Sequence, residues 1–209
     1  MSKYDLTSAD VSKSSNKVLY DAIKRVLDIV GSILGLAIAA PIIAVFGLLV
    51  RLETPGTAFY SQERLGKNGK SFSIYKIRSM YIDAEANGAQ WADKEDSRIT
   101  RMGKFIRKTR IDELPQLLNI LKGDMSIVGP RPERDIFAEE FSKEIPNFND
   151  RLMVKPGLTG LAQVNGGYEI SPKEKLKYDL YYIKHRSLWM DLSILFRTVF
   201  VVIKGDGAR

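Results

Sequence analysis

The longest uncharged run of the chain is Ile29-Val-Gly-Ser-Ile-Leu-Gly-Leu-Ala-Ile-Ala-Ala-Pro-Ile-Ile-Ala-Val-Phe-Gly-Leu-Leu-Val50. As one helix it would be ~33 Å long, which is enough to cross the hydrocarbon core of a bilayer. A signal peptide would be shorter and closer to the N-terminus, and buried helices of soluble proteins rarely extend so far without a charge. We therefore predict a membrane-associated helix over residues 18–52, preceded by a flexible polar tail over residues 1–17.

Pro41 lies inside this run and predicts a break in the helix, because proline lacks the backbone N–H and clashes with the preceding turn. Each half is too short to cross a bilayer alone. The segment either crosses with a kink or bends at Pro41 and returns to the side that it entered. Basic residues flank both ends, with Lys24 and Arg25 before the run and Arg51 after it. Cytosolic flanks attract such residues, which favours the re-entrant helix but leaves a crossing helix open.

Residues 53–209 predict a mostly helical α+β domain. Two short apolar segments around a Gly-rich turn predict a β-hairpin with strands over 56–61 and 71–77. The segment Arg98–Arg110 is rich in Lys and Arg, has no acidic residue, and predicts an amphipathic helix, whole or broken near Gly103, that faces anionic lipid or phosphate. Further helices are predicted over residues 112–123, 133–145, 172–184 and 188–203, the last of them in the core or in the membrane surface.

Composition limits the chemistry that this chain can perform. It has no cysteine and one histidine, His185. These counts exclude a disulfide framework, a zinc site with cysteine ligands and a thiol nucleophile, and they argue against a Ser-His-Asp triad. The chain has 32 Lys and Arg against 25 Asp and Glu, a net charge of +7. We therefore expect an anionic partner: nucleic acid, anionic lipid or a phosphorylated substrate.

Asp112 and Glu113 follow the basic segment directly, at the predicted start of a helix. Asp112 is a good N-cap, and the helix dipole and nearby arginines should keep it ionised. An ionised Asp is a competent nucleophile toward phosphorus. Its attack on an anionic diphosphate requires charge neutralisation, which Mg²⁺ and arginine clamps would supply. The sequence has no Gly-x-x-x-x-Gly-Lys-Ser/Thr loop, so ATP hydrolysis of that type is not supported.

Five motifs carry a resemblance to a known family. They are Tyr75-Lys-Ile-Arg-Ser-Met80, Asp112-Glu-Leu-Pro-Gln-Leu117, Gly129-Pro-Arg-Pro132, Lys155-Pro-Gly-Leu-Thr-Gly-Leu-Ala-Gln-Val-Asn-Gly166 and Ser187-Leu-Trp-Met-Asp-Leu192. In this order, between Lys17 and Ile203, they resemble the bacterial sugar transferases, which are monotopic polyprenyl-phosphate phosphoglycosyl transferases. The resemblance is to the small members of the family, which consist of the catalytic unit.

The resemblance implies that a UDP-sugar gives its sugar-1-phosphate to undecaprenyl phosphate and releases UMP. This is the first membrane step in the synthesis of a surface polysaccharide or capsule. The implied reaction has two steps and depends on Mg²⁺. Asp112 takes the phospho-sugar, Glu113 orients the metal or assists proton movement, and both are implied metal ligands. The implied substrate-binding residues are Lys76, Arg78, Arg107, Arg131, Pro156, Gly157, Thr159, Gln163 and Asn165.

The resemblance also implies a location and a topology. The family's membrane helix is re-entrant with a proline at the bend, a place that Pro41 fits. The protein would then lie in the bacterial cytoplasmic membrane, with its catalytic domain, residues 53–209, facing the cytosol. Two positions depart from the common family pattern. Ala40 stands where many members have Ser before the proline, and Gly167 stands where many have Arg after Asn-Gly.

An alternative function is a basic membrane-anchored adaptor that binds anionic lipid or nucleic acid without catalysis. This alternative explains the net charge but leaves the motifs around Asp112 unexplained. For the enzyme we expect a UDP-sugar, undecaprenyl phosphate and membrane lipids as partners, and no nucleic acid. The sugar, the glycan pathway and the formation of a homo-oligomer stay open.

Overall fold

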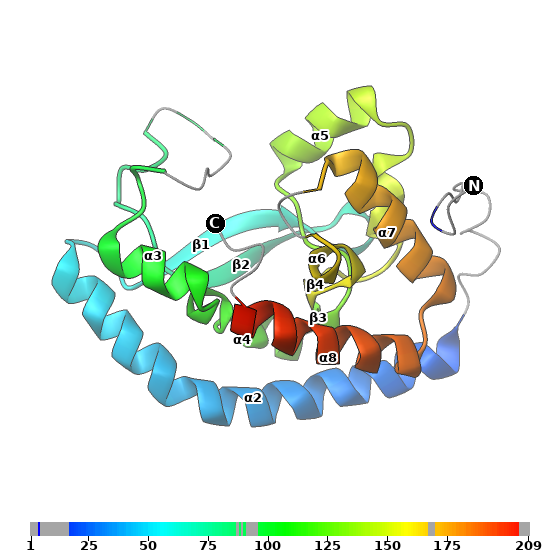
Figure 1. The fold of residues 1–209 in the computed structure, drawn as a ribbon, viewed down its shortest axis with the longest axis horizontal. Helices are drawn as coiled ribbons and strands as arrows, with labels where there is room; N and C mark the ends of the chain where they lie inside the picture. Colours follow the sequence, from blue (N-terminus) through cyan, green and yellow to red (C-terminus); the bar gives the residue numbers. More distant parts are fainter. Residues whose placement is uncertain are drawn as a thin grey trace.

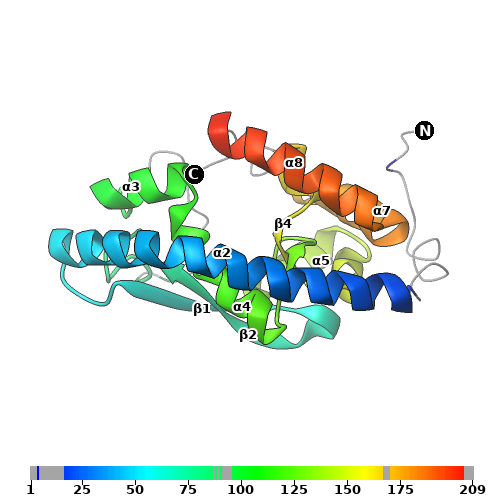
Figure 2. The same cartoon turned by 90° about the horizontal axis from the view of Figure 1, so that it is seen from below.

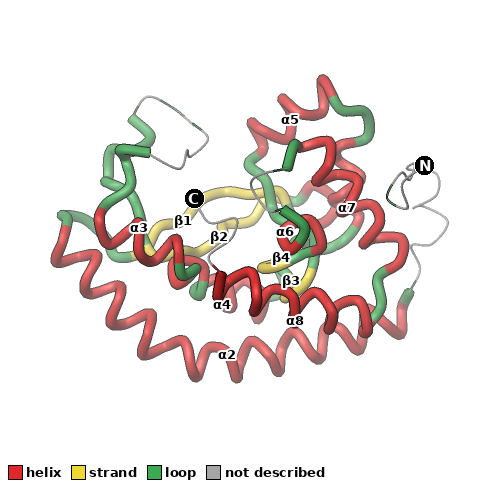
Figure 3. Tube along the Cα trace, viewed as in Figure 1, coloured by secondary structure: helices red, strands yellow, loops and turns green. Residues whose placement is uncertain are grey.

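The computed structural model describes residues 4, 17–86, 88, 90, 96–166 and 170–204. The chain folds as a mostly helical α+β protein, as predicted (Figure 1, Figure 3). The tail predicted over residues 1–17 lies outside the described residues, apart from Tyr4 and Lys17. The helices are α2 (Val18–Glu53), α3 (Arg101–Lys108), α4 (Gln116–Lys122), α5 (Asp135–Glu144), α6 (Leu161–Val164), α7 (Pro172–His185) and α8 (Leu188–Lys204). The strands are β1 (Phe59–Leu65), β2 (Ser71–Ile77), β3 (Ser126–Val128) and β4 (Gly157–Thr159).

Helix α2 continues without interruption through Pro41, contrary to the predicted break. The proline removes one hydrogen-bond donor, but neighbouring side chains on the inner face, Ala39 and Ile43, pack against a core cluster that includes Leu117 of α4. This packing holds both halves in one helix. The bend is spread over the helix, which curves around the rest of the molecule (Figure 1).

One face of α2 packs against the rest of the molecule from end to end. Near its start, Lys24 pairs with Asp191 of α8 at 2.8 Å. Asp28 accepts a hydrogen bond of 2.9 Å from a backbone N–H of β3, and Glu53 accepts one of 3.1 Å from the backbone N–H of Met102. Within the described part of the chain, α2 is the one helix long and apolar enough to cross a membrane.

The predicted hairpin is present, but its first strand lies further along the chain than expected. Strand β2 begins and ends as predicted, whereas β1 begins at Phe59 rather than at residue 56. The residues before it form a turn instead. The Arg78 guanidinium donates hydrogen bonds to the carbonyl oxygens of Thr54 and Thr57, at 2.9 and 2.7 Å, and so holds this turn in place.

Helix α3 is shorter than its predicted segment and is not broken at Gly103. It begins after Thr100, whose side chain accepts a hydrogen bond from the Gly103 N–H. A Cβ atom at Gly103 would lie 1.9 Å from the carbonyl oxygen of Ser79. The absence of a side chain at Gly103 therefore allows α3 to approach the segment that follows β2.

The chain between α3 and α4 differs from the prediction at Asp112. This residue is not an N-cap, because it lies in a separate 3₁₀ turn, Ile111–Glu113, before α4. Arg110 adopts a left-handed conformation with φ of 59°, which ends α3 and redirects the chain into the turn. Helix α4 ends at Gly123 with φ of 97°, as the sequence predicts.

The C-terminal half packs around a parallel pair of strands, β3 and β4, that the sequence analysis did not predict. Helices α5, α7 and α8 lie within about two residues of their predicted bounds. One face of α8 packs into the core through Ile194, whereas Trp189 and Phe196 are exposed. The predicted core position of α8 is therefore confirmed for one face, and its position in the membrane surface stays a prediction. Helices α8 and α2 start close together and diverge along the same side of the molecule (Figure 2).

Candidate active site

A cavity of about 310 Å³ lies among the hairpin, α3, the 3₁₀ turn, α4 and the start of α5. Its lining includes both predicted catalytic carboxylates and four predicted cationic residues. These are Asp112, Glu113, Lys76, Arg78, Arg107 and Arg131. Residues that are separated by more than 50 positions in the sequence therefore meet at one cavity.

Glu113 is buried and paired with two cations. Its carboxylate accepts a hydrogen bond of 2.9 Å from Lys76 Nζ, and it is bound by both terminal nitrogens of Arg131, one of them at 3.4 Å. Burial acts to raise the pKa of Glu113, but Arg131 and Lys76 outweigh it and hold the pKa well below its ordinary value. Glu113 is therefore ionised and holds the two cations beside the cavity.

Asp112 is buried next to Glu113 but accepts no side-chain hydrogen bond from the described residues. Burial raises its pKa to about 6; Lys76 opposes this rise and Glu113 adds to it. The nearby cations lower the pKa of Asp112, as expected, but the loss of water on burial raises it by more. With a pKa of about 6, Asp112 is still mostly ionised at pH 7, and it presents an unpaired carboxylate to the cavity.

The other two cationic residues are held by hydrogen bonds to the protein. Arg107 of α3 donates to the hydroxyl of Ser79 at 3.4 Å. Arg78 is buried, and two of its nitrogens bind the turn carbonyls described above. Its third nitrogen, Nη1, is buried without a hydrogen-bond partner. Arg78 thus anchors the turn before β1 while one of its donors remains unused.

Five predicted substrate-binding residues do not line this cavity: Pro156, Gly157, Thr159, Gln163 and Asn165. The structure places them in β4, in α6 and beside them. Thr159 makes a hydroxyl–hydroxyl contact of 2.7 Å with Thr198 of α8, and Gln163 donates to the carbonyl oxygen of Leu158 at 2.9 Å. Asn165 binds Arg197 of α8 at 2.9 Å. Their described contacts are with the protein core.

The Pro156-Gly157 pair instead supports the Pro-Arg-Pro turn from behind. The Gly157 N–H donates to the carbonyl oxygen of Pro130 at 2.8 Å. A Cβ atom at Gly157 would lie 2.1 Å from the backbone nitrogen of Gly129, so any larger residue would push the turn away. This segment therefore fixes the backbone from which Arg131 reaches Glu113.

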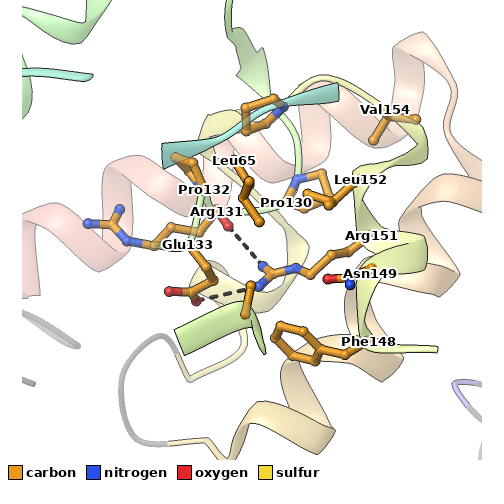
Figure 4. Close-up of a pocket in the computed structure, with 12 residues that line it drawn as sticks. Leu65, Pro130, Arg131, Pro132, Glu133, Phe148, Asn149, Arg151, Leu152 and Val154 are labelled. Carbon is orange, nitrogen blue, oxygen red and sulfur yellow. Dashed lines mark hydrogen bonds and ion pairs between the residues drawn. The ribbon is translucent and has the colours of Figure 1, made fainter. Parts of the chain in front are cut away.

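A second support for Arg131 was missed by the sequence analysis. Arg151 is buried behind the turn and donates to the Arg131 carbonyl oxygen at 2.9 Å (Figure 4). It also pairs with Glu133 at 3.4 Å and with Asp179 of α7 at 2.8 Å. Burial raises the pKa of Asp179 to about 6 against the effect of Arg151. Nothing in the local sequence around Arg151 indicates this pairing, because its partners come from distant segments.

The far end of the cavity is polar and was also missed. Gln62 Nε2 donates to the Tyr60 hydroxyl at 2.9 Å and to Glu85 at 3.2 Å. Glu85 in turn binds both terminal nitrogens of Arg134, at 2.8 and 3.1 Å. The alternation of polar residues Tyr60, Gln62 and Arg64 along β1 is the signal that could have indicated this face.

The carboxylates allow a limited test of the predicted Mg²⁺ site. The described residues contain no group of three or more His, Cys, Asp or Glu that could hold a metal alone. Mg²⁺ is commonly bound by one or two carboxylates together with substrate phosphates and water. The unpaired, buried carboxylate of Asp112 fits such a ligand. The oxygens of Glu113 are occupied by Lys76 and Arg131, so Glu113 would have to release one of them to bind a metal.

Comparison with known proteins identifies the class of protein that has this fold and site. The sequence model of the family described as "Bacterial sugar transferase" matches residues 19–205. The chain therefore belongs to the bacterial sugar transferase family, as its motifs indicated.

Individual relatives support this membership. The chain is 45% identical over 194 residues to the UDP-N-acetylgalactosamine-undecaprenyl-phosphate N-acetylgalactosaminephosphotransferase of Aeromonas hydrophila, covering 91% of this chain and 46% of that protein. It is 63% identical over 139 residues to a putative undecaprenyl-phosphate N-acetylgalactosaminyl 1-phosphate transferase of Bacillus subtilis, covering 66% of this chain and 78% of that protein. A UDP-glucose:undecaprenyl-phosphate glucose-1-phosphate transferase of Caulobacter vibrioides is 42% identical over 197 residues, covering 92% and 74%. The chain thus spans about half the length of the Aeromonas relative.

Proposed function

We propose that this protein transfers a sugar-1-phosphate from a UDP-sugar to undecaprenyl phosphate and releases UMP. The observation that carries the proposal is the contrast between the two adjacent carboxylates at the cavity. Glu113 is saturated by Lys76 and Arg131, whereas Asp112 is ionised, buried and unpaired within the described structure. The names of the relatives, which are undecaprenyl-phosphate sugar phosphotransferases, support the same reaction.

In the first step, a carboxylate oxygen of Asp112 attacks the β-phosphorus of the UDP-sugar. The bond from this phosphorus to the bridging oxygen breaks, UMP leaves, and an acyl phosphate links Asp112 to the sugar. In the second step, a phosphate oxygen of undecaprenyl phosphate attacks the same phosphorus. The Asp112 carboxylate is released, and the product is a lipid diphosphate sugar.

The cations around the cavity have separate tasks in this proposal. Arg107 and Arg131 neutralise the phosphate oxygens as negative charge shifts toward UMP. Glu113 keeps Lys76 and Arg131 in place, so that neither pairs with Asp112 in the absence of substrate. Asp112 is the residue that would bind Mg²⁺, and the bound ion would neutralise the charge of the diphosphate. Glu113 could become a second ligand to Mg²⁺ if it released Lys76 or Arg131.

The packing of α2 supports a membrane position in which both of its ends lie on one side. Contacts from Lys24 to Glu53 join α2 to the same domain, which supports a helix that stays on that domain over a helix that leaves it to stand across a bilayer. Its outer face would instead enter one leaflet and bring Asp112 to the height of the lipid phosphate. The proposal keeps the predicted cytosolic side of the bacterial membrane and replaces the break at Pro41 by a curved helix.

The test of the reaction is UMP release by detergent-solubilised protein with undecaprenyl phosphate and Mg²⁺. UDP-N-acetylgalactosamine is the first donor to try, followed by UDP-glucose and UDP-galactose, because these sugars occur in the names of relatives. We expect release with one donor and none with Asp112→Asn or with EDTA. Full release by Asp112→Asn would rule out Asp112 as the nucleophile. Binding of anionic lipid without any release would favour the adaptor alternative.

The topology has its own test, because the chain has no background cysteine. Single cysteines at Ser2 and Pro55 flank α2 and can be labelled in intact cells and in inverted vesicles. We expect both to react from the cytosolic side only. Labelling from opposite sides would show that α2 crosses the membrane.

A further inference from the structure

Gln116 has a buried amide nitrogen without a hydrogen-bond partner among the described residues. It is the first residue of α4, one helical turn after Asp112, and it is 1% exposed. Its Nε2 atom is buried and makes no hydrogen bond. The side chain lines the same cavity as Asp112 and Glu113. Gln116 was not among the site residues expected from the sequence.

Asn119, on the same helix, shows what a structural amide looks like in this protein. It is fully buried, its Nδ2 donates to the carbonyl oxygen of Ser73 at 2.7 Å, and its Oδ1 accepts from the Tyr75 N–H at 3.1 Å. Asn119 thus ties α4 to β2. Buried amides are almost always satisfied in this way, because an unmet donor costs stability. Among the described residues, Gln116 Nε2 and Gln163 Oε1 are buried amide atoms without a hydrogen-bond partner, and of these two Gln116 is the one that lines the cavity with Asp112.

We infer that Gln116 is a substrate-binding residue whose Nε2 donates a hydrogen bond to an oxygen of the phosphoryl group that is transferred at Asp112. This inference rests on the proposed function. A neutral donor suits this position, since another cation one turn from Asp112 would pair with its carboxylate and weaken the nucleophile. An amide can hold a phosphoryl oxygen without neutralising Asp112. The side chain is also fixed by burial, so it loses little conformational freedom on binding.

The test compares Gln116→Met with the wild-type protein in two measurements. The first is the melting temperature of the protein without substrate. Methionine has nearly the shape of glutamine and no polar amide, so we expect the melting temperature to be unchanged or higher. The second is kcat/KM for UMP release, which we expect to fall by about 10- to 100-fold, the loss typical of a hydrogen bond to a charged group. We expect kcat/KM of Gln116→Glu to be lower still, because this variant replaces the hydrogen-bond donor by an anion.

Asn119→Leu is the matched control, because it removes a buried amide that is fully bonded within the protein. We expect it to lower the melting temperature. A lower melting temperature for Gln116→Met would overturn the inference, since the amide would then have a structural partner. A kcat/KM within about threefold of wild type would also overturn it. If the wild-type protein transfers no sugar, the proposed function fails, but the melting temperatures still decide whether Gln116 has a structural partner.

Discussion

Two ionic clusters flank the Pro-Arg-Pro turn, and they have similar side chains but different surroundings. On one side, Asp112 and Glu113 lie with Lys76 and Arg131 beside a cavity of about 310 Å³. On the other side, Arg151 is enclosed between acidic partners next to a space of about 10 Å³, hardly enough for one water molecule (Figure 4). The first cluster has room for a ligand, and the second has not.

The difference shows that the same ion-pair chemistry borders an open cavity in one place and supports the backbone in the other. Arg131 belongs to both clusters: its side chain binds Glu113, and its carbonyl oxygen accepts from Arg151. The enclosed cluster, around Arg151, therefore holds the backbone of Arg131, whose side chain belongs to the open cluster around Glu113. Enclosure makes a broken ion pair costly, whereas the open cavity leaves Asp112 available for reaction.

The largest expected effect is the loss of transfer in Asp112→Asn, by about 10⁴-fold or more, because the nucleophile is removed.

The Asp112→Asn variant should also be more stable than the wild-type protein at pH 8. A pKa of about 6 in place of 3.8 means that the folded surroundings, burial and neighbouring charges together, disfavour the ionised form by about 3 kcal/mol. Thermal unfolding at pH 8 and single-turnover assays measure the two effects. A clear loss of stability in Asp112→Asn would show that the carboxylate has a structural partner.

The next effect concerns the enclosed cluster. Arg151→Met should lower the free energy of unfolding by about 3–5 kcal/mol, because it leaves the buried carboxylate of Asp179 and the half-buried carboxylate of Glu133 without this cation. Lys76→Met is the matched control in the open cluster and should cost about 1 kcal/mol or less, since Glu113 keeps Arg131 and solvent reaches the cavity. Denaturant unfolding in detergent measures both. Equal losses in the two variants would remove the distinction between the clusters.

The smallest effect is a pH dependence of opposite sign for activity and stability. Transfer needs ionised Asp112, so kcat/KM should fall about tenfold for each pH unit below about 6. Asp112 and Asp179 both have a pKa raised to about 6 in the folded protein. The folded protein therefore binds more protons than the unfolded chain between about pH 4 and 6. Their contribution to stability therefore increases as the pH falls through this range.

Asp179→Asn separates the two carboxyls in this pH experiment. It should remove part of the pH dependence of stability and leave the pH profile of transfer with the same midpoint. A profile of kcat/KM that stays flat down to pH 4.5 would contradict the assignment of the midpoint to Asp112.

Elements with a strong local pattern were predicted well. The uncharged run indicated α2, and α7 begins at Pro172 and α8 at Leu188, as the sequence predicts. Elements set by long-range contacts were missed or misplaced. Strands β3 and β4 are too short to leave a pattern, and β1 begins late because Arg78 holds the preceding turn. Asp112 and Glu113 could be singled out as candidates because they are adjacent in the chain, whereas the pairing of Arg151 with Asp179 has no local sign.

The sequence by itself determined the long apolar helix, the acidic pair after a basic segment, and the family. These properties follow from hydrophobicity, charge and motif order along the chain. Only the tertiary structure decided which groups are paired. It kept α2 continuous by packing Ala39 and Ile43 on the core, and it gave both cations to Glu113 rather than to Asp112. The physical reason is that burial and pairing depend on distances between segments that the sequence does not contain.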